Sequence, residues 1–489
     1  MVMITIGFWV KGMSMMDPDF GLHMRMGEYN VVHRGVPMTD QLSYSMPDYP
    51  VIDHEWLSRN AWYFLYTRIG YGGMAALYAL MATAALVILI PEGARAWSVG
   101  PLFLAAEVLM PRMGIRIQVE TWLLMALMIR IWSDRQLWNK WRWLVPAGFA
   151  LWVNLHGGFA LGIFILAFLL GARSLRKRSV DVGDALVWGA SLTMTGLNPY
   201  GFRVWNEVYL SMTDNMLKGT IAEWMPFYIN AELGWGFLVA MLGFLGWHYR
   251  KEVKPEEVGL WAGLWLAGLS SLRHMALFAV VAGGAVAELW RKLGEGMIRE
   301  GGEVVKRKIR IANRFLMGIG CVLWLWQAGW GVAGMVNSQG YLAYYPVKAA
   351  EYLKTNLPKG NLFSNYGWGG YLVWKLPEKK LFIDGRMPSW RWESPDDRNL
   401  DRAFKDYTDI VSKGTYKEMF SKYDITTVLW SDKKEEGGWL VKLGQWLKEK
   451  GLAVNKGKEG EKLIQALETD GWNKVYTDGT AVIYEKPEK

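Results

Sequence analysis

Long apolar runs separated by short polar segments fill the first two thirds of the chain. A transmembrane helix needs about 20 such residues, or fewer where neighbouring helices shelter it. Eleven runs approach this length, which predicts a polytopic α-helical membrane domain with about 11 transmembrane helices. The block 141–173 could form one kinked helix instead of two. The runs cover residues 1–16, 71–91, 96–111, 118–133, 141–154, 157–173, 184–198, 232–248, 257–271, 273–291 and 313–333.

The distribution of basic residues predicts which side of the membrane each polar segment faces. Four segments rich in Lys and Arg fall on one side when the runs cross alternately, and the positive-inside rule makes that side cytoplasmic. The outer side then receives 17–70, 198–232, the turns at 111–118, 154–158 and 271–274, and everything after 334. The basic segments are 130–142, 173–179, 248–254 and 291–314.

The first apolar run is too short to cross a bilayer upright. Its 16 residues form a helix of about 24 Å, against a hydrocarbon core of about 30 Å. Either this helix is short and tilted, or the natural start lies upstream. We favour an upstream start, because the run also has no cytoplasmic lead.

The pattern changes after residue 334, where charges become dense and long apolar runs end. Short buried strands, an amphipathic helix and a hairpin turning at Asp478-Gly479 are predicted there. We therefore expect a multi-pass domain over 1–335 with an outer loop at 17–70, and an extracytoplasmic α/β domain over 336–489. The predicted strands lie in 361–367, 379–385 and 425–430, the helix in 437–451 and the hairpin in 472–486.

Composition agrees with a membrane part joined to a soluble part. The 489 residues are 52% hydrophobic and include 29 Trp, yet 21% are charged and the mean hydropathy is +0.05. The net charge of +9 fits cytoplasmic loops better than nucleic-acid binding. The single cysteine, Cys321, excludes an internal disulfide and a CxxC site. The start lacks the basic region of a signal peptide, and no Walker, GxGxxG or GxSxG motif indicates a nucleotide or hydrolase site.

Reactive residues gather on the predicted outer side. Five of the six histidines fall there, and polar groups at membrane helix ends need partners or a wet cavity. Their convergence from many helices predicts one outward-facing site. The segments that carry them are DPDFGLH (17–23), DHEWL (53–57), NLHGG (154–158), NPYG (198–201), IAEW (221–224) and LRH (272–274).

Asp17 and Asp19 flank a proline directly after the first apolar run. Such a pair could hold a divalent cation, or one carboxylate could act as a general base while the other orients it. The alternative is helix capping, for which Asp19 is well placed. His23 follows four residues later on the same helical face, where it would bind metal or phosphate or make a structural hydrogen bond.

Three further outer segments each have a functional and a structural interpretation. His54 and Glu55 belong either to the site or to a helix cap. His156 precedes two glycines that permit close backbone approach, or it forms a buried pair with Asn154. Glu223 is a candidate metal ligand or acceptor contact.

Two arginines and a histidine are candidates for binding phosphate. Arg273 is costly at a membrane helix end unless it meets water or an anion, and guanidinium groups bind phosphate with two hydrogen bonds. Arg116 has the same two interpretations, phosphate ligand or headgroup anchor. His274 directly follows Arg273.

The outer segments together resemble the type-C glycosyltransferase superfamily, in its bacterial multi-pass form. The stretch from DPDFGLH to DHEWL (17–57) is similar to the first outer loop of those proteins. WVNLHGGF, LNPYG, IAEW and SLRHMALF resemble later blocks, and NLFSNYGWGGYLVWKLPEKKLFIDGR (361–386) resembles the start of their outer domain. Leu22 departs from the pattern, since relatives often carry Trp there. The superfamily is distantly similar to oligosaccharyltransferase catalytic subunits and protein O-mannosyltransferases.

The resemblance implies an activity and a location. It implies transfer of a sugar from a polyprenyl-phosphate or polyprenyl-diphosphate donor to a protein, glycan or lipid acceptor outside a bacterial plasma membrane, without nucleic acid. An essential acidic residue of the first outer loop falls on Asp19 or Asp17, and the phosphate-binding role falls on Arg273, Arg116 and His274. Candidates on the acceptor side are Tyr366, Trp368, Asp384 and Arg386, with a folded-domain core as the alternative.

Two other classes and the cofactor stay open at this stage. A lipid-linked glycan transporter or flippase would also be multi-pass, but it usually carries ionisable residues near the middle of the membrane. A non-catalytic envelope assembly protein would tolerate changes at Asp17 and Asp19. The resemblance allows a divalent cation, Mg or Mn, with Asp17, Asp19 and Glu223 as ligands.

Overall fold

The chain folds into two compact units in the computed structural model. Unit 1 combines Met1–Asp17 with Ile52–Ala343, and unit 2 combines Pro18–Val51 with Tyr344–Lys489. Each unit is described below by itself. The structure describes residues 1–214, 221–227, 232–337, 340–391, 402–414, 416–432 and 460–487.

Unit 1 is helical, and all eleven predicted apolar runs lie in its helices. The α-helices are α1 (Val2–Ser14), α3 (Trp56–Ile88), α4 (Val99–Leu109), α5 (Gln118–Ser133), α6 (Arg135–Trp141), α7 (Val145–Leu155), α8 (Phe159–Lys177), α9 (Val182–Met194), α10 (Val204–Thr213), α12 (Leu233–His248), α13 (Pro255–Ser270) and α14 (Met275–Asn337). Short 3-10 turns join them: η1 (Glu92–Trp97), η2 (Met110–Arg112), η3 (Arg142–Leu144), η4 (Gly201–Arg203), η5 (Ala222–Trp224), η7 (Leu272–His274) and η8 (Gly340–Leu342).

Three segments of the described chain are long and apolar enough to cross a membrane. They are Trp56–Ile88, Phe159–Lys177 and Leu272–Ile311, and the apolar helices α1 and α12 are shorter. The structure therefore has the helices of a membrane protein, while the number of eleven crossings stays a prediction.

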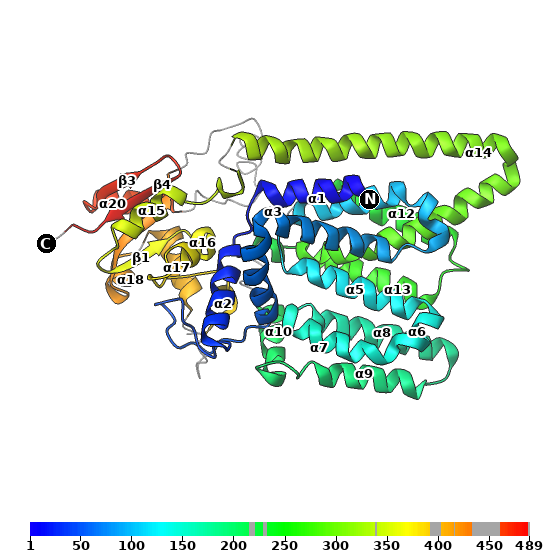
Figure 1. The fold of residues 1–489 in the computed structure, drawn as a ribbon, viewed down its shortest axis with the longest axis horizontal. Coiled ribbons are helices and arrows are strands. Elements are labelled where there is room, and N and C mark those ends of the chain that lie inside the picture. The colour runs from blue at the N-terminus through cyan, green and yellow to red at the C-terminus, as the bar shows by residue number, and fades with distance from the viewer. Residues whose placement is uncertain are drawn as a thin grey trace. The chain divides into compact units, whose positions relative to one another are not determined.

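Two glycines with positive φ divide the longest helices. Gly70 (φ +64°) interrupts α3, and Gly302 (φ +57°) turns α14 back on itself, as Figure 1 shows. Glycine adopts this backbone conformation without the penalty that a Cβ brings. The returning arm of α14 packs on α1, where Trp324 donates from Nε1 to the carbonyl of Met3 at 2.9 Å.

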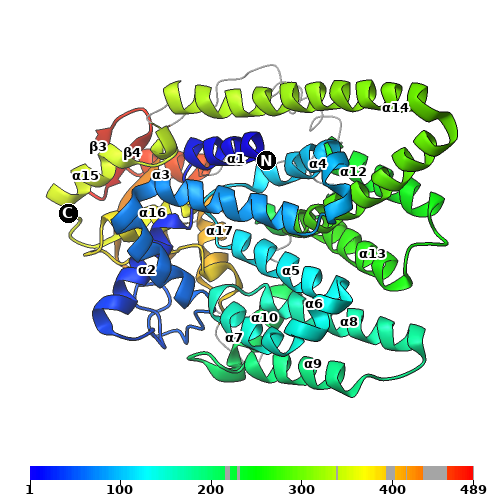
Figure 2. The same cartoon turned by 45° about the vertical axis from the view of Figure 1, so that its right-hand side comes forward.

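The block 141–173 forms two helices rather than one. Helix α7 ends at Leu155 and α8 begins at Phe159, with His156 and two glycines between them. Helices α7, α8 and α9 lie side by side in both views (Figures 1 and 2). The short connection between α7 and α8 thus places His156 at the ends of packed helices.

Unit 2 contains a four-stranded mixed sheet with the order β1-β2-β4-β3. Strand β1 pairs with β2 in parallel, and β4 is antiparallel to both β2 and β3. The strands are β1 (Asn361–Ser364), β2 (Ile425–Ser431), β3 (Asn473–Thr477) and β4 (Ala481–Glu485). The helical elements are α2 (Phe20–His33), α15 (Val347–Thr355), η9 (Tyr366–Trp368), α16 (Gly369–Lys375), η10 (Met387–Ser389), α17 (Ala403–Lys413), α18 (Lys417–Lys422) and α20 (Glu461–Thr469).

The predicted hairpin is confirmed. Gly479 has φ +76°, and Asp478 Oδ1 accepts from the backbone N–H groups of Thr480 and Ala481 at 2.9 and 2.8 Å. The strand predicted over 379–385 contributes only isolated bridges from Leu381 to Ser43 and Leu362. The helix predicted over 437–451 lies outside the described residues.

The first outer segment folds with the C-terminal part of the chain, whereas the sequence grouped it with the membrane domain. The backbone N–H of Leu381 donates to Leu42 O, and that of Tyr44 donates to Leu381 O, both at 3.0 Å. Helix α2 packs on α16, and a Cβ on Gly21 would overlap the carbonyl of Gly370. Pro18–Val51 is thus a structural part of unit 2.

Candidate functional site

A cavity of about 510 Å³ lies inside unit 1, and five residues predicted for the site surround or adjoin it. His54, His156, Arg273 and His274 line it. They come from the segment just before α3, from the α7–α8 junction and from η7. Glu55 stands directly beside two of these histidines, as described below. The structure thus brings together residues that lie far apart in the sequence.

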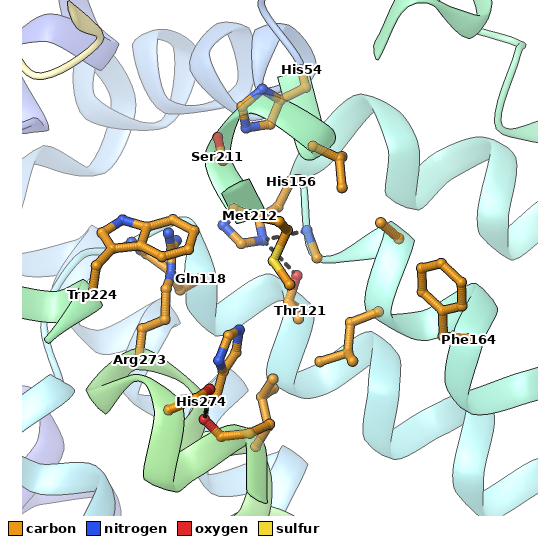
Figure 3. Close-up of a pocket in the computed structure, with 18 of the residues that line it drawn as sticks. His54, Gln118, Thr121, His156, Phe164, Ser211, Met212, Trp224, Arg273 and His274 are labelled. Carbon is orange, nitrogen blue, oxygen red and sulfur yellow. Dashed lines mark hydrogen bonds between the residues drawn. The ribbon is translucent and has the colours of Figure 1, made fainter. Parts of the chain in front are cut away.

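The cavity has a polar and an apolar side. Figure 3 shows Arg273, Trp224 and Gln118 grouped on one side and Phe164 on the opposite side. The Arg273 guanidinium lies 4.7 Å from the centre of the Trp224 ring, a cation–π contact. Phe164 is 63% exposed and Leu266 57%, so the apolar side reaches the surface of its helices.

A second cavity of about 200 Å³ shares Gln118, Trp122 and Arg273 with the first. It is strongly charged, because Arg112 and Arg116 also line it. Arginine offers planar, paired donors that match phosphate oxygens. The two cavities therefore place cationic groups next to an apolar space.

Carboxylates balance these arginines in the structure. Arg116 forms ion pairs with two carboxylates: its Nε lies 2.8 Å from Asp17 Oδ2, and its Nη2 pairs with Glu223. Arg112 binds Glu232 with two hydrogen bonds of 2.9 and 3.0 Å. Asp17, Arg116 and Glu223, each predicted from the sequence, thus form one ion-pair chain.

The His156 ring is fixed by hydrogen bonds that also fix its tautomer. Trp152 donates from Nε1 to Thr121 Oγ1 at 2.9 Å, so the Thr121 hydroxyl hydrogen is available for His156 Nδ1 at 2.7 Å. The Gly158 N–H donates to the same Nδ1 at 3.0 Å, so Nδ1 is an acceptor. The ring then carries its hydrogen on Nε2.

Glu55 stands between the two histidines on this side of the cavity. Its Oε1 lies 3.8 Å from His54 Nε2 and 3.9 Å from His156 Nε2. Arg59 donates to Glu55 Oε2 at 3.1 Å and pairs with Asp53 at 3.1 Å. The carboxylate is therefore held in place by Arg59 and faces both imidazoles.

Asp19 belongs to unit 2 and lies at the N-cap position of α2, but its side chain makes no capping hydrogen bond. Its carboxylate fills the space that a side chain on Gly385 would need. Burial, Asp19 and Asp384 together raise the pKa of the Tyr366 phenol well above its usual value. Asp19, Tyr366 and Asp384 are thus neighbours within unit 2. The structure therefore brings a candidate from the first outer segment next to two acceptor-side candidates from the C-terminal part of the chain.

Asp384 and Arg386 form a buried ion-pair cluster with Asp40. Arg386 donates from Nη2 to Asp40 Oδ1 at 2.7 Å and to Asp384 Oδ2 at 2.6 Å. Burial alone would lower the pKa of Arg386, but the two carboxylates outweigh it and raise that pKa. The cluster ties the first outer segment to the C-terminal part of unit 2.

The two remaining candidates are buried in unit 2. Trp368 is 2% exposed and donates from Nε1 to the carbonyl of Tyr344 at 3.0 Å. His23 lies in α2 and is 7% exposed. Both contribute to packing, and the acceptor-side role of Trp368 stays a prediction.

The divalent cation stays a prediction, and two of its predicted ligands, Asp17 and Glu223, are both paired with Arg116. Arg116 occupies the position between the carboxylates of Asp17 and Glu223. Over the described ranges, no group of three or more His, Cys, Asp or Glu side chains is arranged to hold an ion.

Several cavity residues were missed by the sequence analysis. Gln118 and Thr121 line the first cavity, and Arg112 and Glu232 the second. The available signal was polarity inside a predicted span, since Gln118, Glu120 and Thr121 interrupt an apolar run. Polar residues in such a position are a functional indication.

Comparison with known proteins supports the fold. No protein-family model matches the sequence, and no curated protein sequence matches it. The oligosaccharyltransferase of Archaeoglobus fulgidus in the apo form is similar in structure, with a TM-score of 0.55 and 14% sequence identity over 100% of this chain and 74% of that chain. AglB from the same organism, solved with an inhibitory peptide and a dolichol-phosphate, gives 0.55 and 13% over the same shares. This chain thus shares the fold of these oligosaccharyltransferases, one of the protein classes to which the sequence pattern pointed.

Proposed function

We propose that the chain is a membrane glycosyltransferase that moves a sugar from a polyprenyl-phosphate or polyprenyl-diphosphate donor to an extracytoplasmic acceptor. The observation that carries this proposal is the pair of adjoining cavities, one lined by three arginines and one largely apolar. A polyprenyl phosphate also has two parts, an anionic phosphate that would suit the arginines and an apolar chain that would suit the apolar cavity. The archaeal AglB structure with a dolichol-phosphate and a peptide supports a lipid-linked donor and a protein acceptor.

The arginines would bind the donor phosphate. Arg273 and Arg116 would make charge-assisted hydrogen bonds to its oxygens, with Arg112 and His274 close by. The phosphate would compete with Glu223 for Arg116. The polyprenyl chain would lie along the apolar side at Phe164 and Leu266.

The reaction would exchange one bond at the anomeric carbon. The acceptor oxygen or nitrogen bonds to that carbon while the bond from carbon to phosphate oxygen breaks, and the electron pair leaves with the polyprenyl phosphate. The proton lost by the acceptor passes to a carboxylate of the first outer loop, Asp19 or Asp17. Asp17 is the one that Arg116 holds.

The proposal is tested by sugar transfer or release from a panel of polyprenyl-phosphate sugars by the purified full chain in detergent. Asp17→Asn, Asp19→Asn and Arg273→Gln are compared with wild type. Loss of a general base lowers turnover about 10²–10⁴-fold, which we expect for one of the two aspartate variants. Arg95→Gln is the matched control, because Arg95 is exposed and is not among the residues that line either cavity.

Two outcomes would overturn the proposal or add to it. If wild type binds the lipid without cleaving it, and both aspartate variants behave in the same way, a transporter or assembly function replaces the transferase. Turnover that is lost with a chelator and restored by Mg²⁺ or Mn²⁺ would add a cation.

A further inference from the structure

Glu120 is a carboxyl group buried inside unit 1 that the proposed reaction does not use. It lies in the first turn of α5, next to Thr121, and it is 8% exposed. Hydroxyl groups from α3 contact both of its oxygens: Tyr78 contacts Oε1, and Ser58 Oγ lies 2.5 Å from Oε2. A charge in this place would be costly, because burial removes its water.

The number of hydrogens available for hydrogen bonding decides whether the Glu120 carboxyl group is protonated. Ser58 Oγ also lies 2.9 Å from the carbonyl of Leu155, and a hydroxyl has one hydrogen to donate. That carbonyl is among the last four of α7, which lack partners inside their helix. Ser58 can donate to Leu155 only if Glu120 itself supplies the hydrogen between Oε2 and Ser58.

With a protonated Glu120, the hydrogen bonds of this network all run in one direction, from Trp62 to the Leu155 carbonyl. Trp62 donates from Nε1 to the Tyr78 oxygen, Tyr78 donates to Glu120 Oε1, Glu120 donates to Ser58, and Ser58 donates to Leu155. An ionised Glu120 would take the hydrogen of Ser58 and leave the Leu155 carbonyl without this donor. It would also repel the carboxylate of Glu55.

We infer that Glu120 is a neutral carboxylic acid and a positioning residue for the α7–α8 junction. Through Ser58 it holds Leu155, while its neighbour Thr121 holds the His156 ring in the tautomer with hydrogen on Nε2. The first turn of α5 thus anchors both sides of the segment that presents His156 to the cavity. The structural part of this inference does not depend on the proposed function, and only its kinetic consequence does.

The test replaces Glu120 by the residue that imitates its protonated form. A glutamine accepts from Tyr78 through its carbonyl and donates to Ser58 through its amide, whereas alanine does neither. Infrared spectra of the full chain in detergent should show a protonated carboxylic acid band that is missing in Glu120→Gln. Nitrogen NMR of labelled histidine should show His156 with hydrogen on Nε2 in wild type and Glu120→Gln.

The kinetic consequence gives an independent readout. We expect Glu120→Gln to keep transfer activity within about twofold, and Ser58→Ala to lower kcat about tenfold with little change in KM. Ser133→Ala is the matched serine control, because Ser133 is exposed and bonds only the carbonyl of Arg130 among the contacts described for it. Glu120→Ala is added where it folds.

The inference is overturned if no acid band disappears in Glu120→Gln, or if that variant loses the His156 tautomer with hydrogen on Nε2. If the wild-type chain transfers no sugar, the infrared and NMR readouts still decide the state of Glu120. Failure of the proposed function and failure of this inference are therefore separate results.

Discussion

Asp19 has its place in unit 2 because residue 385 has no side chain. The Asp19 carboxylate lies where a Cβ on Gly385 would stand, and Tyr366 and Asp384 are its neighbours. Tyr366 keeps its phenolic hydrogen, because burial and these carboxylates raise its pKa. The surroundings of Asp19 thus offer a hydrogen-bond donor next to a candidate base.

We predict that Gly385→Ala displaces Asp19. The added methyl group would overlap Asp19 Oδ1, so the carboxylate must rotate away or the backbone must shift. If Asp19 is the base, turnover should fall at least tenfold toward that of Asp19→Asn, as measured by the donor panel assay.

The control for this change is Gly189→Ala, since nothing lies near a Cβ at that position in α9. A folded Gly385→Ala protein with wild-type turnover, together with an inactive Asp17→Asn, would assign the base role to Asp17.

At the scale of elements, local patterns predicted the helices and the hairpin, while distant pairings were out of reach. Each apolar run lies in a helix, and Asp478-Gly479 makes the turn, because these features depend on neighbouring residues. The packing of Pro18–Val51 with the C-terminal part rests on contacts between residues more than 300 positions apart, such as Tyr44 Oη to the Leu362 carbonyl. No local periodicity encodes such a contact.

The same limit applies to the candidate site. The sequence identified Asp17, Arg116 and Glu223 as separate candidates, and the structure joins them through ion pairs. Glu120 and Thr121 are predicted as residues of a span, because the polar residues of an apolar run do not reveal their partners. Tertiary packing, and no spacing rule, supplies Ser58 and Tyr78 as those partners.

The contact between α2 and α16 makes a prediction about stability. A Cβ on Gly370 would overlap the carbonyl of Pro18, and a Cβ on Gly21 would overlap that of Gly370. Overpacking of this kind costs about 1–3 kcal/mol. We expect Gly21→Ala and Gly370→Ala each to lower the unfolding temperature in detergent, with Gly236→Ala as a control that has open space.

The double variant distinguishes a shared contact from two separate ones. Substitutions that press on the same backbone are not additive, so Gly21→Ala with Gly370→Ala should cost less than the sum of the two. An additive result, or no change in either single variant, would contradict close packing of these helices.

At the scale of the whole molecule, the asymmetry of basic residues predicts how the chain is oriented in the membrane. The net charge of +9 comes largely with the predicted cytoplasmic segments, and retention of Lys and Arg on that side is the basis of the positive-inside rule. The predicted orientation would place Asp17, Asp19 and the chain after residue 334 outside, where a sugar acceptor would be met.

Labelling of single cysteines tests this orientation directly. Cys321 is the only cysteine, so Cys321→Ala gives a background without thiols. Lys177, at the end of α8, and Lys413, at the end of α17, are both exposed. In spheroplasts, a membrane-impermeant maleimide should label Lys413→Cys at once and Lys177→Cys only after permeabilisation. Labelling of Lys177→Cys in intact spheroplasts, with protection of Lys413→Cys, would reverse the orientation and place the candidate aspartates on the cytoplasmic side, where the proposed extracytoplasmic transfer could not occur.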